Sequence, residues 1–271
     1  MFERVKREEV PEVLDYFAQD RKNCLYSLID LKKYGIDNPN LVLYVDRDAF
    51  GAIRCVLTCY FGGANVFSCK DALDEKETAR MLNKLAPSMI NAPDATIRLL
   101  RPLLHSEATH SHYEYEQGYV TEYCKDLAEE TDFPEVEEAG EEDLLEIARL
   151  ICTDEGLGGT YEPESFAAQL LERRRDGFGR NYCIRKEGKI VCHAGTYAEV
   201  DDLAVVSGVI TAEDFRGQNL AYKVVSKLSR QLTAEGKLPC LFYYTKSAAR
   251  LYEKAGFALG TPWAKLIRKQ G

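Results

Sequence analysis

The sequence predicts an α/β fold with mixed β-sheets flanked by helices, arranged as two similar units in tandem. Three observations lead to this prediction. Segments with apolar residues at helical spacing alternate with short apolar runs that are typical of strands. Turn signals such as Glu187-Gly188 separate neighbouring strand-like runs. The order helix, helix, strands, helix, strand occurs once in each half of the chain, which indicates that one α/β unit has been duplicated.

The first half, which we expect to form a domain over residues 1–128, begins with two helical segments. A third helix follows a group of strands, and Asp74 is a suitable N-cap for it because its carboxylate accepts from free N–H groups of the first turn. We predict helices over residues 8–18, 24–34 and 74–86, and strands over residues 41–45, 52–60, 64–68, 96–100 and 113–125.

An acidic joint over residues 128–143 leads into the second half and is interrupted by Pro134. Around Val136 it alternates apolar and acidic residues, so we expect a short strand there. Its last three acids fall in the first turn of the next helix, where they interact favourably with the helix dipole. We interpret the run as a linker and a solvated helix start rather than as a metal or substrate site.

The second half, which we expect to form a domain over residues 129–271, repeats the order of the first. Gly236 and Gly256 follow the last two helical segments and are suited to end them. We predict helices over residues 144–152, 164–174, 220–234 and 247–255, and strands over residues 181–185, 189–198, 203–211, 239–244, 257–260 and 264–267.

The composition excludes several classes of function. The net charge of -9 argues against nucleic acid or an anionic membrane as the partner. The cysteines form no CxxC pair, so zinc spacing is absent and we expect no metal. The charged start Met1–Arg4 leads into no apolar signal region, and no run of about 18 apolar residues occurs. We therefore expect a cytoplasmic protein with reduced thiols.

The most informative stretch is Val209–Ala221, which predicts an anion-binding site. It reads as the end of an apolar strand, then a turn, then Arg216-Gly217 at the start of a helix. A helix N-terminus offers unpaired backbone N–H groups and a partial positive charge. Gly217 lets the backbone come close to a ligand, and Arg216 adds a cation. The expected ligand is a phosphate-bearing cofactor that lies across the end of the strand.

Two motifs in this half resemble those of the GNAT superfamily of acyl-CoA N-acyltransferases. The family's cofactor loop follows a strand and is often written Arg-Gly-x-Gly-x-Ala; it reads here Arg216-Gly217-Gln218-Asn219-Leu220-Ala221. The family's helix Ala-x-x-Leu-Tyr-Glu-Lys-x-Gly-Phe is matched in full by residues 248–257. With a helix and a strand between them, the two motifs are far more specific than a lone glycine loop. The resemblance covers roughly residues 133–267.

The resemblance implies a site for acetyl-CoA. The backbone of Val209, Ile210 and Thr211 would pair with the pantetheine arm as if it were another strand, and the strand over residues 239–244 would diverge to leave a slot. One backbone N–H near Val209 or Ile210 would polarise the thioester carbonyl. The N–H groups of residues 217–221 would bind the pyrophosphate. Ser247, at the start of the second motif's helix, is expected to contact the cofactor as well.

The resemblance also implies catalytic roles. Tyr252 occupies the family's tyrosine position and would act as the general acid that protonates the CoA thiolate. The alternative is a packing tyrosine that only contacts CoA. Glu199, Asp201 and Asp202 lie just before the Val209 strand, and His193 lies on the preceding strand. Glu199 is our first choice among them for a general base, although a dedicated base is dispensable if the amine arrives neutral.

The sequence departs from the family pattern at two places. Asn219 stands where the cofactor loop usually has its second glycine, so a side chain enters a tight loop. Residues 68–73, at the equivalent place in the first half, contain no glycine. We therefore expect the first half to be a degenerate GNAT-like unit that does not bind CoA and shapes the substrate cleft.

The expected function is transfer of an acetyl group from acetyl-CoA to a primary amine, most plausibly that of a small molecule. A protein or peptide amine is the next choice of acceptor, and a non-catalytic acyl-CoA-binding module is the rival from another class. A homodimer is left open by the sequence.

Overall fold

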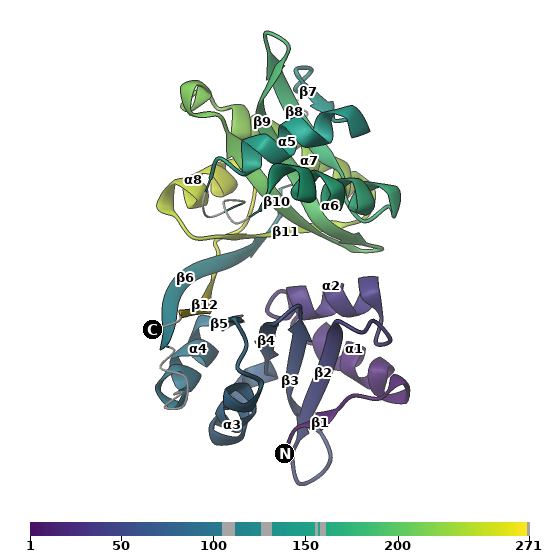
Figure 1. The fold of residues 1–271 in the computed structure, drawn as a ribbon, viewed down its shortest axis with the longest axis vertical. Helices are drawn as coiled ribbons and strands as arrows, with labels where there is room; N and C mark the ends of the chain where they lie inside the picture. The colour runs from purple at the N-terminus through teal and green to yellow at the C-terminus, as the bar shows by residue number, and fades with distance from the viewer. Residues whose placement is uncertain (105–111, 126–131, 155–156, 158–160, 270–271) are drawn as a thin grey trace. The chain divides into compact units, whose positions relative to one another are not determined.

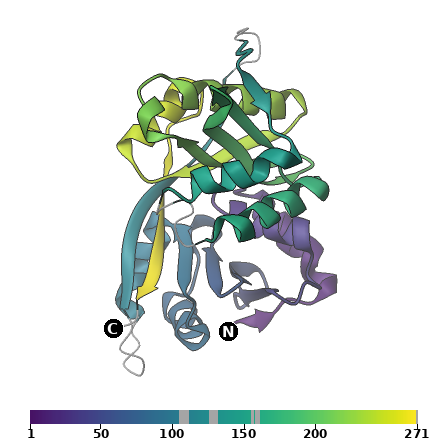
Figure 2. The same cartoon turned by 45° about the horizontal axis from the view of Figure 1, so that its top comes forward.

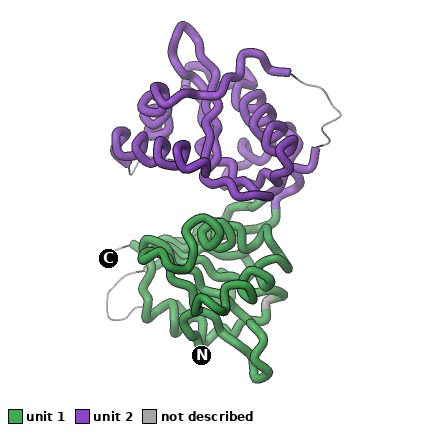
Figure 3. Tube along the Cα trace, turned by 90° about the vertical axis from the view of Figure 1, so that its right-hand side faces the viewer, with its two compact units in different colours: residues 1–120, 261–271 green, residues 121–260 purple. Residues whose placement is uncertain are grey.

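The computed structural model describes residues 1–104, 112–125, 132–154, 157 and 161–269, and it separates into two compact units. Unit 1 comprises residues 1–120 and 261–271, and unit 2 comprises residues 121–260 (Figure 3). The boundary that the sequence suggested, between residues 128 and 129, lies outside the described residues. The mixed α/β class with a duplicated unit is confirmed.

Unit 1 is a mixed sheet with helices packed against it. Its strands run in the order β1-β2-β3-β4-β5-β12-β6 across the sheet (Figure 1). The helices are α1 (Val10–Ala18), α2 (Leu25–Tyr34), α3 (Glu75–Leu85) and α4 (Asp94–Leu100), and the strands are β1 (Glu3–Arg4), β2 (Leu41–Arg47), β3 (Ile53–Tyr60), β4 (Gly63–Phe67), β5 (Met89–Pro93), β6 (His112–Glu122) and β12 (Thr261–Lys269).

The last strand of the chain belongs to unit 1, whereas the sequence placed it with the second half. β12 pairs antiparallel with β5 on one side and with β6 on the other. Its Ala264 and Leu266 are fully buried in the core that α3 and α4 share with β3, β4 and β5. The sequence placed this strand in the second half because it follows that half along the chain and falls within the resemblance over residues 133–267, but its apolar residues are buried against unit 1.

Two of the predicted strands are wrong. Residues 96–100, predicted as a strand, belong to helix α4, while the strand of this region is β5, just before it. Residues 257–260 form no strand, because Phe257 makes only an isolated bridge with Tyr123. Short apolar runs do not separate strand from helix by periodicity, and long-range pairing decides between them.

The strands of unit 2 are adjacent in the order β11-β10-β9-β8-β7, with β10 and β11 parallel and the other pairs antiparallel. None of the helices in the described part of the chain is long and apolar enough to cross a membrane. The strands are β7 (Val136–Glu138), β8 (Asn181–Lys186), β9 (Lys189–Val200), β10 (Leu203–Thr211) and β11 (Leu238–Tyr243), and the helices are α5 (Leu144–Ile151), α6 (Pro163–Arg175), α7 (Leu220–Ala234) and α8 (Lys246–Ala255).

Helices cover the sheet of unit 2. Side chains of α5 and α6 form one buried core with Cys183 of β8, Ile190 of β9 and Ile210 of β10, and Figure 2 shows these two helices side by side across the strands. α7 carries a stripe of buried residues that includes Val224, Leu228 and Leu232, and it packs against the sheet as well. The sheet is thereby held rigidly where β10 leads into α7.

Candidate functional site

The corner between β10 and α7 has the backbone shape that the sequence predicted. β10 ends at Thr211, a single 3-10 turn over Glu213–Phe215 follows, and α7 begins at Leu220. Gly217 has a φ of 80° and Asn219 a φ of 59°. Glycine adopts such positive φ values without strain, and asparagine is among the few other residues that tolerate them.

The N-terminus of α7 is left without a protein cap. Asn219 is the N-cap residue, but its side chain does not bond to the first turn of the helix, and that turn contains no acidic residue. The first N–H groups of a helix have no partner within the helix and carry its partial positive charge. The backbone at this corner is therefore available to bind an anion.

A cavity of about 370 Å³ lies in front of this helix N-terminus. Three cationic side chains line it, those of Arg216, Arg250 and Lys254, and none of its lining residues among those that the structure describes is acidic. Arg250 and Lys254 come from α8 and lie one helical turn apart. The combination of three cations with free N–H groups fits a ligand with more than one negative charge.

Asn219, the departure from the glycine of the loop, is accommodated by a specific contact. Its Oδ1 accepts a hydrogen bond of 3.0 Å from the Nζ of Lys254, and the same ammonium lies 4.7 Å from the centre of the Tyr222 ring. Arg216 is likewise fixed, because its Nε donates to the carbonyl oxygen of Thr211 at 3.2 Å. Both side chains are thus anchored to neighbouring groups.

A second cavity, of about 310 Å³, continues the first along β10. It is lined by Val209, Ile210 and Thr211 of the strand and by Tyr252 of α8. The two cavities share several lining residues and therefore form one slot. The shared residues are Thr211, Arg216, Ala221, Ser247 and Leu251.

The slot exists because two neighbouring strands separate. β10 and β11 run parallel and pair at Leu203, Ala204 and Val205 of β10, and no pairing follows beyond Val205 among the described residues. The β11-facing edge of residues 206–211 is consequently unpaired, and it offers N–H and C=O groups to an extended ligand in the manner of a strand edge.

Packing against two aromatic rings holds the Tyr252 side chain in place. Its side chain is buried, and its ring centre lies 5.8 Å from that of Tyr243 in β11 and 5.8 Å from that of Phe257. Burial raises the pKa of the Tyr252 phenol well above its ordinary value, so the hydroxyl keeps its proton at neutral pH. Within the described part of the chain, no protein group bonds to this hydroxyl.

Comparison with known proteins agrees with this geometry. Residues 165–266 match the family model described as GNAT acetyltransferase. Solved structures with similar folds include a GNAT-family acetyltransferase from Colwellia psychrerythraea, at 13% identity over 99% of this chain and 99% of that chain with a TM-score of 0.61. A tandem GNAT protein from the clavulanic acid biosynthesis pathway follows at 12% identity, over 100% and 98% of the two chains, with a TM-score of 0.60.

The second half of the chain thus matches the GNAT acetyltransferase family over residues 165–266. The fold of the whole chain is similar to that of solved GNAT-family proteins, among them a tandem GNAT protein. A GCN5-related N-acetyltransferase from Sphaerobacter thermophilus has the same fold, with 11% identity over 100% of this chain and 95% of that chain and a TM-score of 0.65. No curated protein sequence matches the chain. At these identities the structural likeness shows the fold alone, so the roles of individual residues rest on the geometry of this chain.

Most of the residues predicted for the cofactor site line the slot of this unit. Gln218 is the exception, because it is exposed at the tip of the loop and lines neither cavity. Thr245, the residue before α8, caps this helix by accepting from the Ala248 N–H at 3.2 Å. The residues brought together are Val209, Ile210, Thr211, Arg216, Gly217, Asn219, Leu220, Ala221, Ser247 and Tyr252.

Glu199, the first choice for a general base, lies outside the slot. Its carboxylate bonds to Arg180 and Lys237, and it lines a separate cavity with Arg174 and Arg180. Burial favours a raised pKa for Glu199, but hydrogen bonds from Arg180, Lys237 and Thr196 outweigh it and hold the pKa below its ordinary value. A paired carboxylate of low pKa is a structural group here and not a base for the slot.

Sequence reasoning missed three charged residues of the slot. Arg250 and Lys254 lie in the second motif, and their spacing from Ser247 places all three on one helix face, a signal that was present in the sequence. Asp154, which follows α5, lines the cavity that contains Tyr252. No spacing rule connects Asp154 to α8, so only the fold reveals that they face one cavity.

Proposed function

We propose that this chain transfers the acetyl group of acetyl-CoA to the primary amine of a small molecule. The observation that carries the proposal is a single slot in unit 2. It joins an uncapped helix N-terminus, an unpaired strand edge and a buried tyrosine that keeps its proton. Each of these three features matches one part of acetyl-CoA.

The pyrophosphate of CoA fits the cationic end of the slot. The N–H groups of residues 217–221 and the side chain of Arg216 supply donors and positive charge there. The pantetheine arm carries two amide groups and fits the free edge of β10 at residues 206–211 as an added strand. The thioester then lies beside Tyr252.

The chemistry asks for little covalent participation by the protein. The amine nitrogen attacks the thioester carbonyl, the C–N bond forms, and the tetrahedral intermediate collapses as the C–S bond breaks. Tyr252 donates its proton to the departing sulfur, and a proton lost by the nitrogen returns to the solvent or to a nearby base. A raised pKa suits Tyr252 to this role of acid, since the phenol stays protonated until the thiolate develops.

Asp154 takes the place that the sequence assigned to Glu199. It is the acidic residue among the described residues that line the Tyr252 cavity. A carboxylate at this position attracts a cationic acceptor and accepts the proton of the attacking amine. Its Oδ1 also accepts from the Leu157 N–H at 3.1 Å, which orients the carboxylate.

The first experiment measures acetyl-CoA binding by calorimetry and the release of free thiol with a panel of small amines, peptides and lysine-containing proteins. We expect binding in the micromolar range and acceptor-dependent thiol release with a small amine. Binding without thiol release from any acceptor would favour the non-catalytic module, and release only with peptides would move the acceptor to that class. Absence of binding would reject the proposal.

The role of Tyr252 is tested by Tyr252→Phe, which keeps the packing and removes the acid. We expect kcat to fall by about 100-fold or more with the acetyl-CoA affinity nearly unchanged, in line with the loss of a general acid. Tyr243→Phe, on the neighbouring strand, is the matched control and should leave kcat almost unaltered. Equal activity of Tyr252→Phe and the wild type would leave Tyr252 as a packing residue only.

A further inference from the structure

β10 carries a bulge beside the slot. Its pairing with β9 is regular at Ser207, which faces Gly195, and resumes at Ile210, which faces His193. Gly208 and Val209 therefore stand opposite the single residue Ala194. An extra residue of this kind breaks the ladder locally and changes the direction of the peptide groups that it contains.

A buried histidine holds the bulge. The Nδ1 of His193 lies 2.7 Å from the carbonyl oxygen of Gly208, and its Nε2 lies 3.0 Å from the Oδ1 position of the Asn181 amide. A carbonyl oxygen only accepts, so Nδ1 carries the proton. The Nε2 of a neutral ring accepts, and a half-turn of the Asn181 amide brings its NH2 group to that position.

The space around the ring leaves it one position. His193 is only 1% exposed. A Cβ on Gly208 would lie 3.1 Å from the Cε1 of His193, and a Cβ on Gly195 would lie 3.2 Å from the same atom. Gly208 also has a φ of 64°, which glycine adopts without strain. Two glycines thus make room for the imidazole directly under the bulge.

The hydrogen bond to Gly208 orients the next N–H group as well. The described residues contain no cis peptide bond, and in a trans peptide the C=O and the following N–H point in opposite directions. Since the Gly208 carbonyl points to His193, the Val209 N–H points away from it. Val209 lines the cavity that also contains Tyr252. The N–H therefore points away from His193, in a residue that lines the slot beside β10.

We propose that His193, supported by Asn181, is a positioning residue that fixes the Gly208–Val209 peptide group so that the Val209 N–H donates to the thioester oxygen of bound acetyl-CoA. The inference rests on the proposed function and on the donor that the resemblance implies, a backbone N–H of β10 that stabilises the negative charge of the tetrahedral intermediate. What it adds is the pair of side chains that hold this N–H in place. A donor held in place before the reaction stabilises that charge more than one that must reorient.

The burial of His193 agrees with a fixed, uncharged role. Burial lowers the pKa of the imidazole to about 4, while its bond to Gly208 opposes the shift. The ring is therefore neutral at physiological pH and does not itself exchange protons with the substrate. If His193 were only a core residue whose ring nitrogens need hydrogen-bond partners, it would form the same hydrogen bonds but would have no effect on the thioester.

The decisive experiment compares the wild type, His193→Leu and His193→Asn. Leucine leaves the Gly208 carbonyl without a donor, whereas the asparagine amide places an N–H near the position of Nδ1. Acetyl-CoA labelled with ¹³C at the thioester carbonyl is bound to each protein, and the ¹³C resonance is recorded without an acceptor. We expect a downfield shift on binding to the wild type, its loss in His193→Leu and its recovery in His193→Asn.

Kinetics with the acceptor found in the screen provide the second readout. His193→Leu should lower kcat by about 10- to 100-fold, as expected for a misplaced oxyanion donor, and change the KM for acetyl-CoA by less than about threefold. Val191→Ala, a buried change on the same strand, is the control for lost stability and should keep both kcat and the ¹³C shift. Equal ¹³C shifts in the wild type and His193→Leu would overturn the inference.

Crystal structures of the proteins without acetyl-CoA distinguish a failure of this inference from a failure of the proposed function. In the wild type the Gly208 carbonyl should face His193, and in His193→Leu the peptide should turn or become disordered. An unchanged peptide in the leucine variant would overturn the inference even if acetyl-CoA binds. A wild type that binds no acetyl-CoA would reject the proposed function, and the assigned donor with it, whatever the peptide does.

Discussion

The corner between β10 and α7 in unit 2 has a counterpart in unit 1, between β4 and α3. In both, a strand pairs in parallel with the next strand of the sheet for only three positions, Leu203–Val205 with β11 and Gly63–Asn65 with β5. In both, a helix follows after a short irregular linker. The two corners share their topology, and they differ in what their backbone donors are doing.

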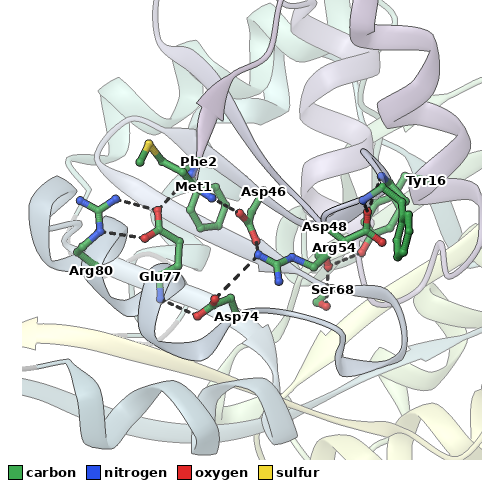
Figure 4. Close-up of polar contacts among 12 residues, drawn as sticks. Met1, Phe2, Tyr16, Asp46, Asp48, Arg54, Ser68, Asp74, Glu77 and Arg80 are labelled. Carbon is green, nitrogen blue, oxygen red and sulfur yellow. Dashed lines mark hydrogen bonds and ion pairs between the residues drawn. The ribbon is translucent and has the colours of Figure 1, made fainter.

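In unit 1, backbone N–H groups of the linker and of the first turn of α3 already donate hydrogen bonds to protein side chains. Figure 4 shows the Asp74 carboxylate accepting from the Glu77 N–H, 3.0 Å away, and Glu77 in turn pairing with Arg80. The hydroxyl of Tyr16 accepts from the Cys69 N–H at 2.8 Å in the linker. The first turn of α3 also contains two acids, Glu75 and Glu77, which repel an anion.

The strands β10 and β4 also differ in how much of their edge is left unpaired. β10 continues over residues 206–211 beyond its pairing with β11 and contains a bulge, whereas β4 ends with Val66 and Phe67 and pairs with β3 without any shift of register. The Phe67 ring is buried against Tyr16 and Phe17, with ring centres 5.3 and 5.7 Å away. At this corner unit 1 therefore has neither a free strand edge of that length nor an uncapped N-terminus of α3, and we infer that it does not bind CoA there.

The largest expected effect comes from giving unit 2 the cap of unit 1. Asn219→Asp with Tyr222→Glu places two carboxylates where α3 has Asp74 and Glu77. We expect the Kd for CoA to rise by about 100-fold, because two negative charges then face the pyrophosphate. Calorimetry measures this.

Two controls accompany that variant. Tyr222→Gln, a neutral change at the same position, should weaken binding only about threefold, since it adds no charge at the helix N-terminus. The reverse change in unit 1, Asp74→Asn with Glu77→Gln, should create no second CoA site. Two sites in a titration of that variant would show that the acids alone separate the two units.

The next effect concerns the stability of unit 2 in acid. The pKa of His193 is about 4 in the folded protein against an ordinary 6.5, so the unfolded chain binds the proton first as the pH falls. Folding should therefore lose about 1.6 kcal/mol through this residue between pH 6.5 and pH 5. β3, the counterpart of β9 in unit 1, contains no histidine.

Urea unfolding at both pH values, in the wild type and in His193→Asn, measures this contribution as a difference. The subtraction removes the carboxylates that both proteins share. An equal loss of stability in the two proteins would mean that His193 is not held neutral by burial.

A smaller effect is expected from Arg216, the cation of the unit 2 loop. Arg216→Ala should weaken CoA binding about tenfold, which is about 1.4 kcal/mol, because one charge near the pyrophosphate is lost. Lys70, in the linker of unit 1, is the matched control, and Lys70→Ala should leave the affinity as it is. Equal losses in both variants would place CoA somewhere other than the unit 2 corner.

The smallest effect is on the stability of unit 1. Asp74→Ala removes the cap of α3 and should lower the free energy of unfolding by about 1 kcal/mol, the usual value of an N-cap. CoA affinity should not change. A drop in affinity with unchanged stability would contradict the separation of the two corners.

Much of the fold was predictable because its patterns are local. The amphipathic helix over residues 220–234 and the strand over residues 203–211 agree with α7 and β10 at both ends. The helix that carries Tyr252 was predicted within one residue of α8. Periodic spacing and the caps fix such elements through contacts between near neighbours.

The errors arose where contacts between distant segments decide. Residues 96–100 are apolar enough for a strand, but pairing of β5 with β4 and β12 leaves them to form α4. Glu199 follows a plausible strand, yet Arg180 and Lys237 neutralise it. Neither partner is near Glu199 in the sequence, so no local pattern could show the pairing.

The sequence by itself predicted the resemblance to the GNAT superfamily, the loop of residues 216–221 and the place of Tyr252 in the second motif, because these lie in contiguous motifs whose spacing has a physical meaning. The tertiary structure alone decided which unit holds the last strand, which carboxylate faces Tyr252, and how His193 meets the bulge at Gly208. Each of these depends on strands and helices far apart in the chain, and packing brings them together only when the whole unit folds.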